Sequence, residues 1–201
     1  PFIWFEYIRD AGRIIHEKGM VNVLVTNGYV NEEPLRELLP IVDAMNVDIK
    51  SMRPDFYKKV CGGKLEDVLR TVEIAHELCH IEVTNLVITN YNDTDEDFEK
   101  LAGWVSLINP SNPVHFSRYF PQYKFTEPQT PISTLNRAYE IARSKLSYVY
   151  VGNAAIEDAS DTFCPKCRNL LIKRLHYSVI TDGIKDGVCE VCGFPFDIKG
   201  I

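Results

Sequence analysis

The feature that most constrains this chain is a regular alternation of short β-branched runs with amphipathic segments. The predicted strands, rich in Val, Ile and aromatic residues, cover 21–26, 44–49, 81–88, 114–119 and 148–151. The predicted helices, with apolar residues at helical spacing, cover 4–18, 31–39, 64–78, 95–107 and 130–145. Successive strand centres lie about 30 residues apart, the size of one strand–helix–strand unit. The alternation predicts the α/β class with a parallel sheet, either an open doubly wound sheet or a barrel.

Polar residues follow the predicted strands where such folds carry their chemistry, at the carboxyl ends. Asp48 and Lys50 lie two positions apart, so both side chains point to one face of their strand. A carboxylate and an ammonium on the inner face are costly unless they pair or meet a polar ligand. Two interpretations remain open: a salt bridge at the end of the strand, or a pair that binds the hydroxyl groups of a diol.

Glu82, Thr84 and Leu86 share one face of the third predicted strand. If that face is interior, Glu82 is a buried acid that needs a partner; if it is exterior, it is an ordinary surface residue. His115, on the fourth strand, is either a satisfied core or edge residue or a ligand contact.

Four of the six cysteines form two CxxC pairs, Cys164 with Cys167 and Cys189 with Cys192. Such pairs in a chain without a secretory signal predict a metal site rather than disulfides, and four thiolates close tetrahedrally around Zn²⁺. With short predicted strands at 170–173 and 177–181, they predict a zinc ribbon over 161–201, after a larger domain over 1–160. Metal binding would supply the folding energy of so small a unit. A rubredoxin-type iron site uses the same ligands and is the alternative.

The overall charge and hydropathy exclude two classes of partner. The formal net charge is −6, whereas a nucleic-acid binder needs a basic surface. No apolar run approaches the roughly 20 residues of a membrane-spanning helix. Reduced thiolates predict a location in the cytoplasm.

The order of several short motifs carries a family resemblance. The motifs are VLVTNGYVNEEPLREL at 24–39, DAMNVDIKSMRPDFYKKVCGG at 43–63, HIEVTNLVITNYNDT at 80–94, PVHFSRYFPQYKF at 113–125 and YVYVGN at 148–153. Together with the terminal CxxC pairs, they resemble the radical S-adenosylmethionine (SAM) enzymes. Within these, the chain is similar to the glycyl-radical activating enzymes, such as pyruvate formate-lyase activating enzyme, and especially to the AmmeMemoRadiSam system radical enzyme family.

This resemblance implies a fold, a reaction and a set of site residues. The fold would be a partial (β/α)6 barrel, here without its first two strands. The reaction would be reductive cleavage of SAM to a 5′-deoxyadenosyl radical, with a [4Fe–4S] cluster, an electron donor such as flavodoxin or ferredoxin, and a protein or small-molecule substrate. By resemblance, the cofactor site would include Thr26 and Asn27 as lining, Asp48 and Lys50 on the ribose hydroxyls, Thr84 and Leu86 beside the cofactor, and His115 in contact with it.

The sequence also departs from the family pattern. The CxxxCxxC motif that ligates the cluster and the Gly-Gly-Glu motif that binds the methionyl amine do not occur among the 201 residues. The resemblance assigns both to the two missing strands, so we expect them upstream of Pro1 and expect this chain alone to be inactive. Thr89-Asn90 replaces the Pro-Gly that usually follows the third strand here. The alternative function is a non-catalytic scaffold that carries a structural zinc ribbon.

Overall fold

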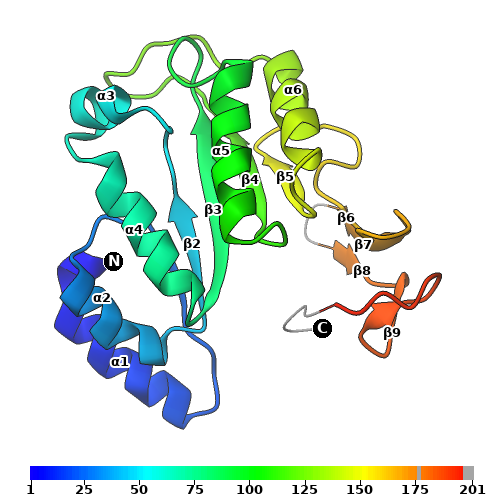
Figure 1. Cartoon of the computed structure of the whole chain (residues 1–201), viewed down its shortest axis with the longest axis horizontal. Helices are drawn as coiled ribbons and strands as arrows, with labels where there is room; N and C mark the ends of the chain where they lie inside the picture. The colour runs from blue at the N-terminus through cyan, green and yellow to red at the C-terminus, as the bar shows by residue number, and fades with distance from the viewer. Residues whose placement is uncertain (176–177, 197–201) are drawn as a thin grey trace.

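A computed structural model describes residues 1–175 and 178–196. Its main body is a sheet of five strands: β1 (Val23–Thr26), β2 (Ala44–Asp48), β3 (His80–Val87), β4 (Val114–Arg118) and β5 (Val149–Gly152). All neighbouring strands run parallel, in the order β1-β2-β3-β4-β5 (Figure 1). The predicted parallel α/β architecture is confirmed.

The helices gather on one side of this sheet. The longer ones are α1 (Phe5–Glu17), α2 (Glu32–Leu38), α4 (Leu65–His76), α5 (Asp95–Ile108) and α6 (Ile132–Arg143). Single turns occur at η1 (Phe2–Trp4), η2 (Leu39–Ile41), α3 (Pro54–Phe56) and the π-helical η3 (Tyr57–Cys61). Since the strand order follows the chain and parallel crossovers are right-handed, the helices lie on one face, as α4, α5 and α6 do in Figure 1. This arrangement is barrel-like, because a doubly wound sheet carries helices on both faces.

The core of the main body fills the space between the sheet and the helices. Val47, Val83 and Phe116 point toward the helices and are completely buried. Phe98 of α5 meets Phe116 edge-on, with ring centroids 5.6 Å apart. Because side chains alternate along a strand, the residues between these point to the opposite side, which we call the open face.

The turn after β1 needs a glycine at position 28. Gly28 has a φ of +68°, and a Cβ built there would lie 2.8 Å from Cγ1 of Val47. The Thr71 hydroxyl of α4 donates to the Gly28 carbonyl at 2.7 Å. The glycine therefore allows the chain to pass tightly between β2 and α4.

The carboxyl-terminal unit is a separate, small β structure. Strands β6 (Thr162–Phe163), β7 (Leu170–Leu175) and β8 (Ser178–Ile180) form one antiparallel set, and β9 (Ile184–Lys185) pairs with β10 (Val188–Cys189). The strand predicted at 170–173 is present and longer. Of the strand predicted at 177–181, residues 178–180 are confirmed, and Tyr177 lies outside the described residues. Leu171 and Ile172 pack with Cys164 and Cys189 in a core of their own.

The predicted helices and strands of the main body all occur, with ends within two residues of expectation. One end has a clear local cause: Thr94 accepts from the Asp97 backbone N–H, and the Asp97 carboxylate accepts from the Thr94 N–H, a reciprocal capping box at the start of α5. Over the described stretches of the chain, no helix combines the length and the apolar content needed to cross a membrane.

Candidate functional site

The pairing of the strands places four polar residues in one row across the open face. Three of them are predicted site residues, and the fourth is Tyr150. Asp48 of β2 pairs with Thr84 of β3, Thr84 with His115 of β4, and His115 with Tyr150 of β5. Paired residues of parallel strands point to the same side of the sheet. The row therefore brings residues from four strands together: it crosses β2 at its last residue, β3 near its middle, and β4 and β5 at their second residues. Asp48 alone of the four lies at the carboxyl end of its strand, where α/β folds bind their ligands.

Asp48 and Lys50 form an ion pair at one end of this row. The Lys50 Nζ lies 2.9 Å from Asp48 Oδ1, and the two side chains are 31% and 30% exposed. The two sequence-based interpretations are compatible with this geometry. The residues pair with each other in this structure, and both remain accessible to a ligand with hydroxyl groups.

The backbone of the Asp48–Lys50 segment is fixed by residues that the sequence analysis did not single out as site residues. The Asn92 amide donates to the Lys50 carbonyl at 2.6 Å, and the Asn85 amide donates to the Ile49 carbonyl at 2.7 Å. The Lys50 N–H donates to the hydroxyl oxygen of Tyr57 at 3.1 Å. Burial raises the pKa of Tyr57 to about 12, so this hydroxyl stays protonated at neutral pH.

A carboxylate–histidine cluster joins His115 of the row to Glu82 and His80, which lie two and four positions before Thr84 on β3. Glu82 Oε2 lies 2.8 Å from His115 Nε2, and Glu82 Oε1 lies 3.5 Å from His80 Nε2. The Asn46 amide reaches Glu82 Oε2 at 3.4 Å and accepts from the Thr84 hydroxyl at 2.7 Å. The hydrogen bond from His115, and then that from His80, hold the pKa of Glu82 far below its usual range.

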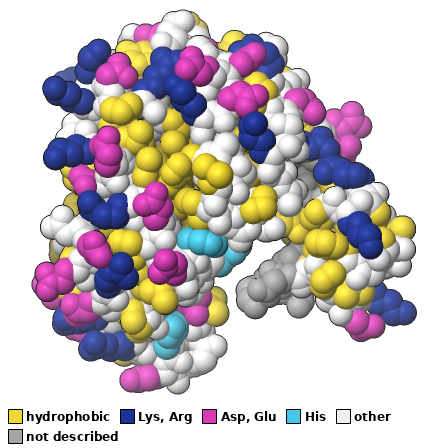
Figure 2. Space-filling model, in the orientation of Figure 1, with side chains coloured by type: hydrophobic (Ala, Val, Ile, Leu, Met, Phe, Trp, Pro, Cys, Tyr) yellow, Lys and Arg dark blue, Asp and Glu magenta, His cyan; other side chains and the backbone are white. Residues whose placement is uncertain are grey.

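The cluster decides the alternatives left open for Glu82, whose side chain lies on the open face and pairs with His115. Figure 2 shows histidine side chains at the hollow between the main body and the carboxyl-terminal unit.

Three further predicted site residues lie apart from this polar network. Thr26 differs from expectation: it pairs with Val47, so its side chain turns toward the helices, where it is 3% exposed. Its hydroxyl accepts from the Gly28 N–H at 3.1 Å. Asn27 is exposed just beyond β1, and Leu86 lies half-buried on the open face.

The four cysteines of the CxxC pairs converge in the carboxyl-terminal unit. Their Sγ atoms all lie within 4.8 Å of one another, and the Cys164–Cys192 and Cys167–Cys189 Sγ pairs are each 3.6 Å apart. Four thiolates at roughly 2.3 Å from one tetrahedral ion stand about 3.8 Å apart. The donor set and its spacing therefore suit a metal ion.

Comparison with known proteins finds a matching sequence profile and a longer relative. The sequence profile described as the radical SAM superfamily matches residues 1–105. An uncharacterized protein of Methanocaldococcus jannaschii, MJ0808, is 43% identical over 204 residues, which cover 98% of this chain and 60% of the relative. The chain thus spans less than two thirds of the length of that protein.

Solved structures share the fold at low sequence identity. A domain of pyruvate-formate lyase-activating enzyme from Bacteroides vulgatus superposes with a TM-score of 0.67 at 15% identity, covering 76% of this chain and 94% of that domain. Streptococcus suis SuiB, in a structure bound to S-adenosylmethionine, superposes with a TM-score of 0.56 at 8% identity, covering 73% of this chain and 34% of SuiB. At these identities the likeness concerns the fold alone.

Proposed function

This chain belongs to the radical SAM superfamily, and from this premise we propose that it acts in the reductive cleavage of SAM. One electron enters the sulfonium, the bond between sulfur and C5′ breaks, and methionine leaves. The resulting 5′-deoxyadenosyl radical takes a hydrogen atom from the substrate and becomes 5′-deoxyadenosine. In this chemistry a [4Fe–4S] cluster would supply the electron, and a flavodoxin or ferredoxin is the donor that we propose to reduce it.

The residues present do not fit the cluster, so we propose that its ligands come from outside these 201 residues. The sequence contains no CxxxCxxC, and Cys61 and Cys79 stand alone. The ribbon thiolates lie at distances suited to a single ion. Two observations support further residues that supply the ligands: the relative is longer than this chain, and β1 is an edge strand of the described five-stranded sheet.

The observation that carries the proposal is the polar row across the open face, which starts at Asp48 at the carboxyl end of β2. In it, the Asp48 carboxylate accepts hydrogen bonds from the ribose hydroxyls of SAM, and the Lys50 ammonium donates to them. Thr84 and Leu86 lie beside the nucleoside, and His115 contacts it from the next strand. Asn27 is placed to approach from the loop after β1, whereas the buried Thr26 hydroxyl serves the turn itself.

We propose further that the enzyme is of the glycyl-radical activating type. The motif order from 24 to 153 supports this subtype, and the fold shared with the activating-enzyme domain is compatible with it. The substrate would then be a protein that carries the abstracted hydrogen, or a small molecule. The superfamily match does not favour the alternative of a non-catalytic scaffold.

We also propose that the four ribbon cysteines hold a structural zinc ion. Support comes from the two CxxC pairs and from the short distances between their Sγ atoms. All four positions are thiolates, which leaves no open coordination site for catalysis. A reducing cytoplasm, where such thiolates stay reduced, is the compartment that we propose.

The test uses the full-length protein, reconstituted anaerobically with iron and sulfide. Asp48→Asn should weaken SAM binding roughly ten- to a hundredfold, because it removes a charged hydrogen-bond acceptor, while the absorption of the cluster stays unchanged. Asp55→Asn is the matched control, since Asp55 is exposed and pairs only with Lys59 at 3.5 Å.

Formation of 5′-deoxyadenosine with a chemical reductant should fall in proportion to SAM occupancy for Asp48→Asn. Unchanged SAM affinity in that variant would remove Asp48 from the site. A wild-type protein that holds its cluster and binds SAM yet releases no 5′-deoxyadenosine would instead support the scaffold.

A further inference from the structure

The imidazole of His115 is held in place from two directions. Its Nε2 lies 2.8 Å from the Glu82 carboxylate. Its ring stacks on Tyr150, with centroids 5.1 Å apart and planes inclined by 25°. A ring stacked on a neighbour and hydrogen-bonded at one nitrogen has little freedom to turn about its side-chain bonds. The position of Tyr150 therefore helps to decide where His115 lies.

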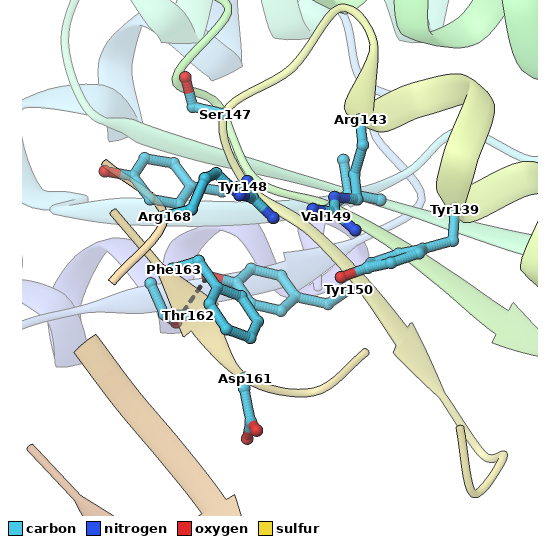
Figure 3. Close-up of a pocket in the computed structure, with 10 residues that line it drawn as sticks. All are labelled: Tyr139, Arg143, Ser147, Tyr148, Val149, Tyr150, Asp161, Thr162, Phe163 and Arg168. Carbon is cyan, nitrogen blue, oxygen red and sulfur yellow. Dashed lines mark hydrogen bonds between the residues drawn. The ribbon is translucent and has the colours of Figure 1, made fainter. Parts of the chain in front are cut away.

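Tyr150 is in turn held by the carboxyl-terminal unit. Its hydroxyl shares a hydrogen bond of 2.9 Å with the hydroxyl of Thr162, drawn in Figure 3. The Arg174 guanidinium of β7 donates to the same Thr162 oxygen at 2.8 Å. That guanidinium also lies 5.4 Å from the centroid of the Tyr150 ring, within the range of a cation–π contact. The hydroxyl of Tyr150 thus contacts Thr162, and its ring contacts Arg174; both partners belong to the carboxyl-terminal unit.

Arg174 is itself held by hydrogen bonds, so it can fix the position of the residues that it contacts. Its backbone N–H donates to Asp161 at 2.8 Å, and its guanidinium donates to the Ser160 carbonyl at 2.9 Å. Asp161 is 2% exposed and pairs with Lys173 Nζ at 2.7 Å. Two residues before Arg174, Ile172 packs in the core that contains the metal-site cysteines. The backbone of β7 and the contacts of Arg174, Thr162 and Tyr150 therefore connect the core around Cys164 and Cys189 to the open face.

The side chains around the small pocket in Figure 3 come from both units. Tyr139 and Arg143 of α6 and the β5 segment form one wall, and Asp161, Thr162 and Phe163 form the other. Side chains of the two units therefore meet beside β5, and the carboxyl-terminal unit covers the β5 side of the main body.

We propose that Arg174 is a positioning residue for the site on the open face: through Thr162 and Tyr150 it holds the His115 imidazole, so the four-cysteine ribbon forms part of that site. The link from Arg174 to His115 stands on the contacts above. Only its consequence for SAM binding rests on the proposed function.

The test follows the ring nitrogens of His115 by ¹⁵N NMR in the zinc-loaded full-length protein, with the signals assigned by a His115→Gln variant. Arg174→Ala should shift both ring-nitrogen signals and weaken SAM binding about three- to tenfold, the effect of losing one cation–π contact and one hydrogen bond to a charged group. Lys185→Ala, a change of an exposed lysine on the ribbon hairpin, should leave both unchanged.

Two readouts keep the outcomes distinct. Zinc content should stay at the wild-type level in Arg174→Ala; if it falls, Thr162→Val removes the hydroxyl link while keeping the arginine, and the same shift of the His115 signals is expected. Signals of His115 that superimpose on the wild type in both variants would overturn the proposal. Failure of the wild-type protein to bind SAM would refute the proposed function alone, since the His115 signals would still report the link.

Discussion

Replacing Glu82 by Gln should destabilise the main body, and more so at pH 5.5 than at pH 3.5. Gln keeps the shape of the side chain and removes the charge. In the folded protein the carboxylate contacts His115 at 2.8 Å, Asn46 at 3.4 Å and His80 at 3.5 Å. A hydrogen bond to a charged group contributes about 1.5–3 kcal/mol when buried. The Glu82 side chain is 35% exposed, so solvent screening reduces the expected loss to about 1–2 kcal/mol.

The pH dependence follows from the direction of the pKa shift. His115 and His80 lower the pKa of Glu82 in the folded state, so folding favours the ionised form. The stabilisation is fully present above the unfolded-state pKa, about 4.3, and declines as the pH falls through and below it toward the folded-state pKa. The difference between wild type and variant should therefore shrink by about half or more at pH 3.5.

Urea unfolding measures both values. Trp104 of α5 packs partly buried against the main core, and its fluorescence reports on that unit. With a slope of about 2 kcal/mol per molar urea, the expected loss lowers the midpoint by about 0.5–1 M at pH 5.5. Glu73→Gln, an exposed position on α4, is the control. Equal midpoint shifts for the two variants at pH 5.5, or a Glu82 effect that persists undiminished at pH 3.5, would refute the reasoning.

Three more outcomes are expected. Cys167→Ser should lower the zinc content from about one ion per chain to near zero by elemental analysis and expose residues beyond 162 to proteolysis; full zinc content would contradict the four-thiolate site. Gly28→Ala should cost about 1–3 kcal/mol more in urea unfolding than Gly19→Ala, because both glycines have positive φ but only Gly28 meets a neighbour within 4 Å; equal costs would refute the steric argument. Asp161→Asn should destabilise the ribbon, since it removes the buried carboxylate that pairs with Lys173 at 2.7 Å and accepts from the Arg174 N–H at 2.8 Å, seen as faster hydrogen exchange in β6 and β7; unchanged exchange would count against it.

The helices and strands of the main body could be predicted because the spacing of apolar residues within each segment indicates which side is buried. Val47 and Val83 alternate with half-buried residues along their strands, and Thr94 with Asp97 marks the start of α5 within four residues. Such signals need no knowledge of distant contacts. The strands of the ribbon hairpin are two residues long, which is too short for any periodicity, so the CxxC spacing and the predicted strands at 170–173 and 177–181 indicated the unit but not this hairpin.

The partners of the candidate site could not be predicted, because they depend on register between distant segments. Glu82 and His115 are 33 positions apart, and the sequence alone left open which face of β3 is interior. Thr26 shows the same limit at the scale of one residue: the strand was placed correctly, yet its last side chain turns to the helix face. A shift of one position along a strand exchanges the two faces.

The pairing of polar groups on the open face explains how the sheet can carry them without a ligand. Glu82 is bonded to His115, and Asp48 to Lys50, so these half-buried charges have partners. The Asp48–Lys50 pair is about one-third exposed, and an exposed ion pair contributes only about 0–1 kcal/mol. A diol that accepts from Lys50 and donates to Asp48 therefore replaces a weak contact with two charge-assisted hydrogen bonds. Since Asn85 and Asn92 fix the backbone beneath the pair, the exchange requires side-chain rotation alone, and little of the binding energy is lost to ordering the segment.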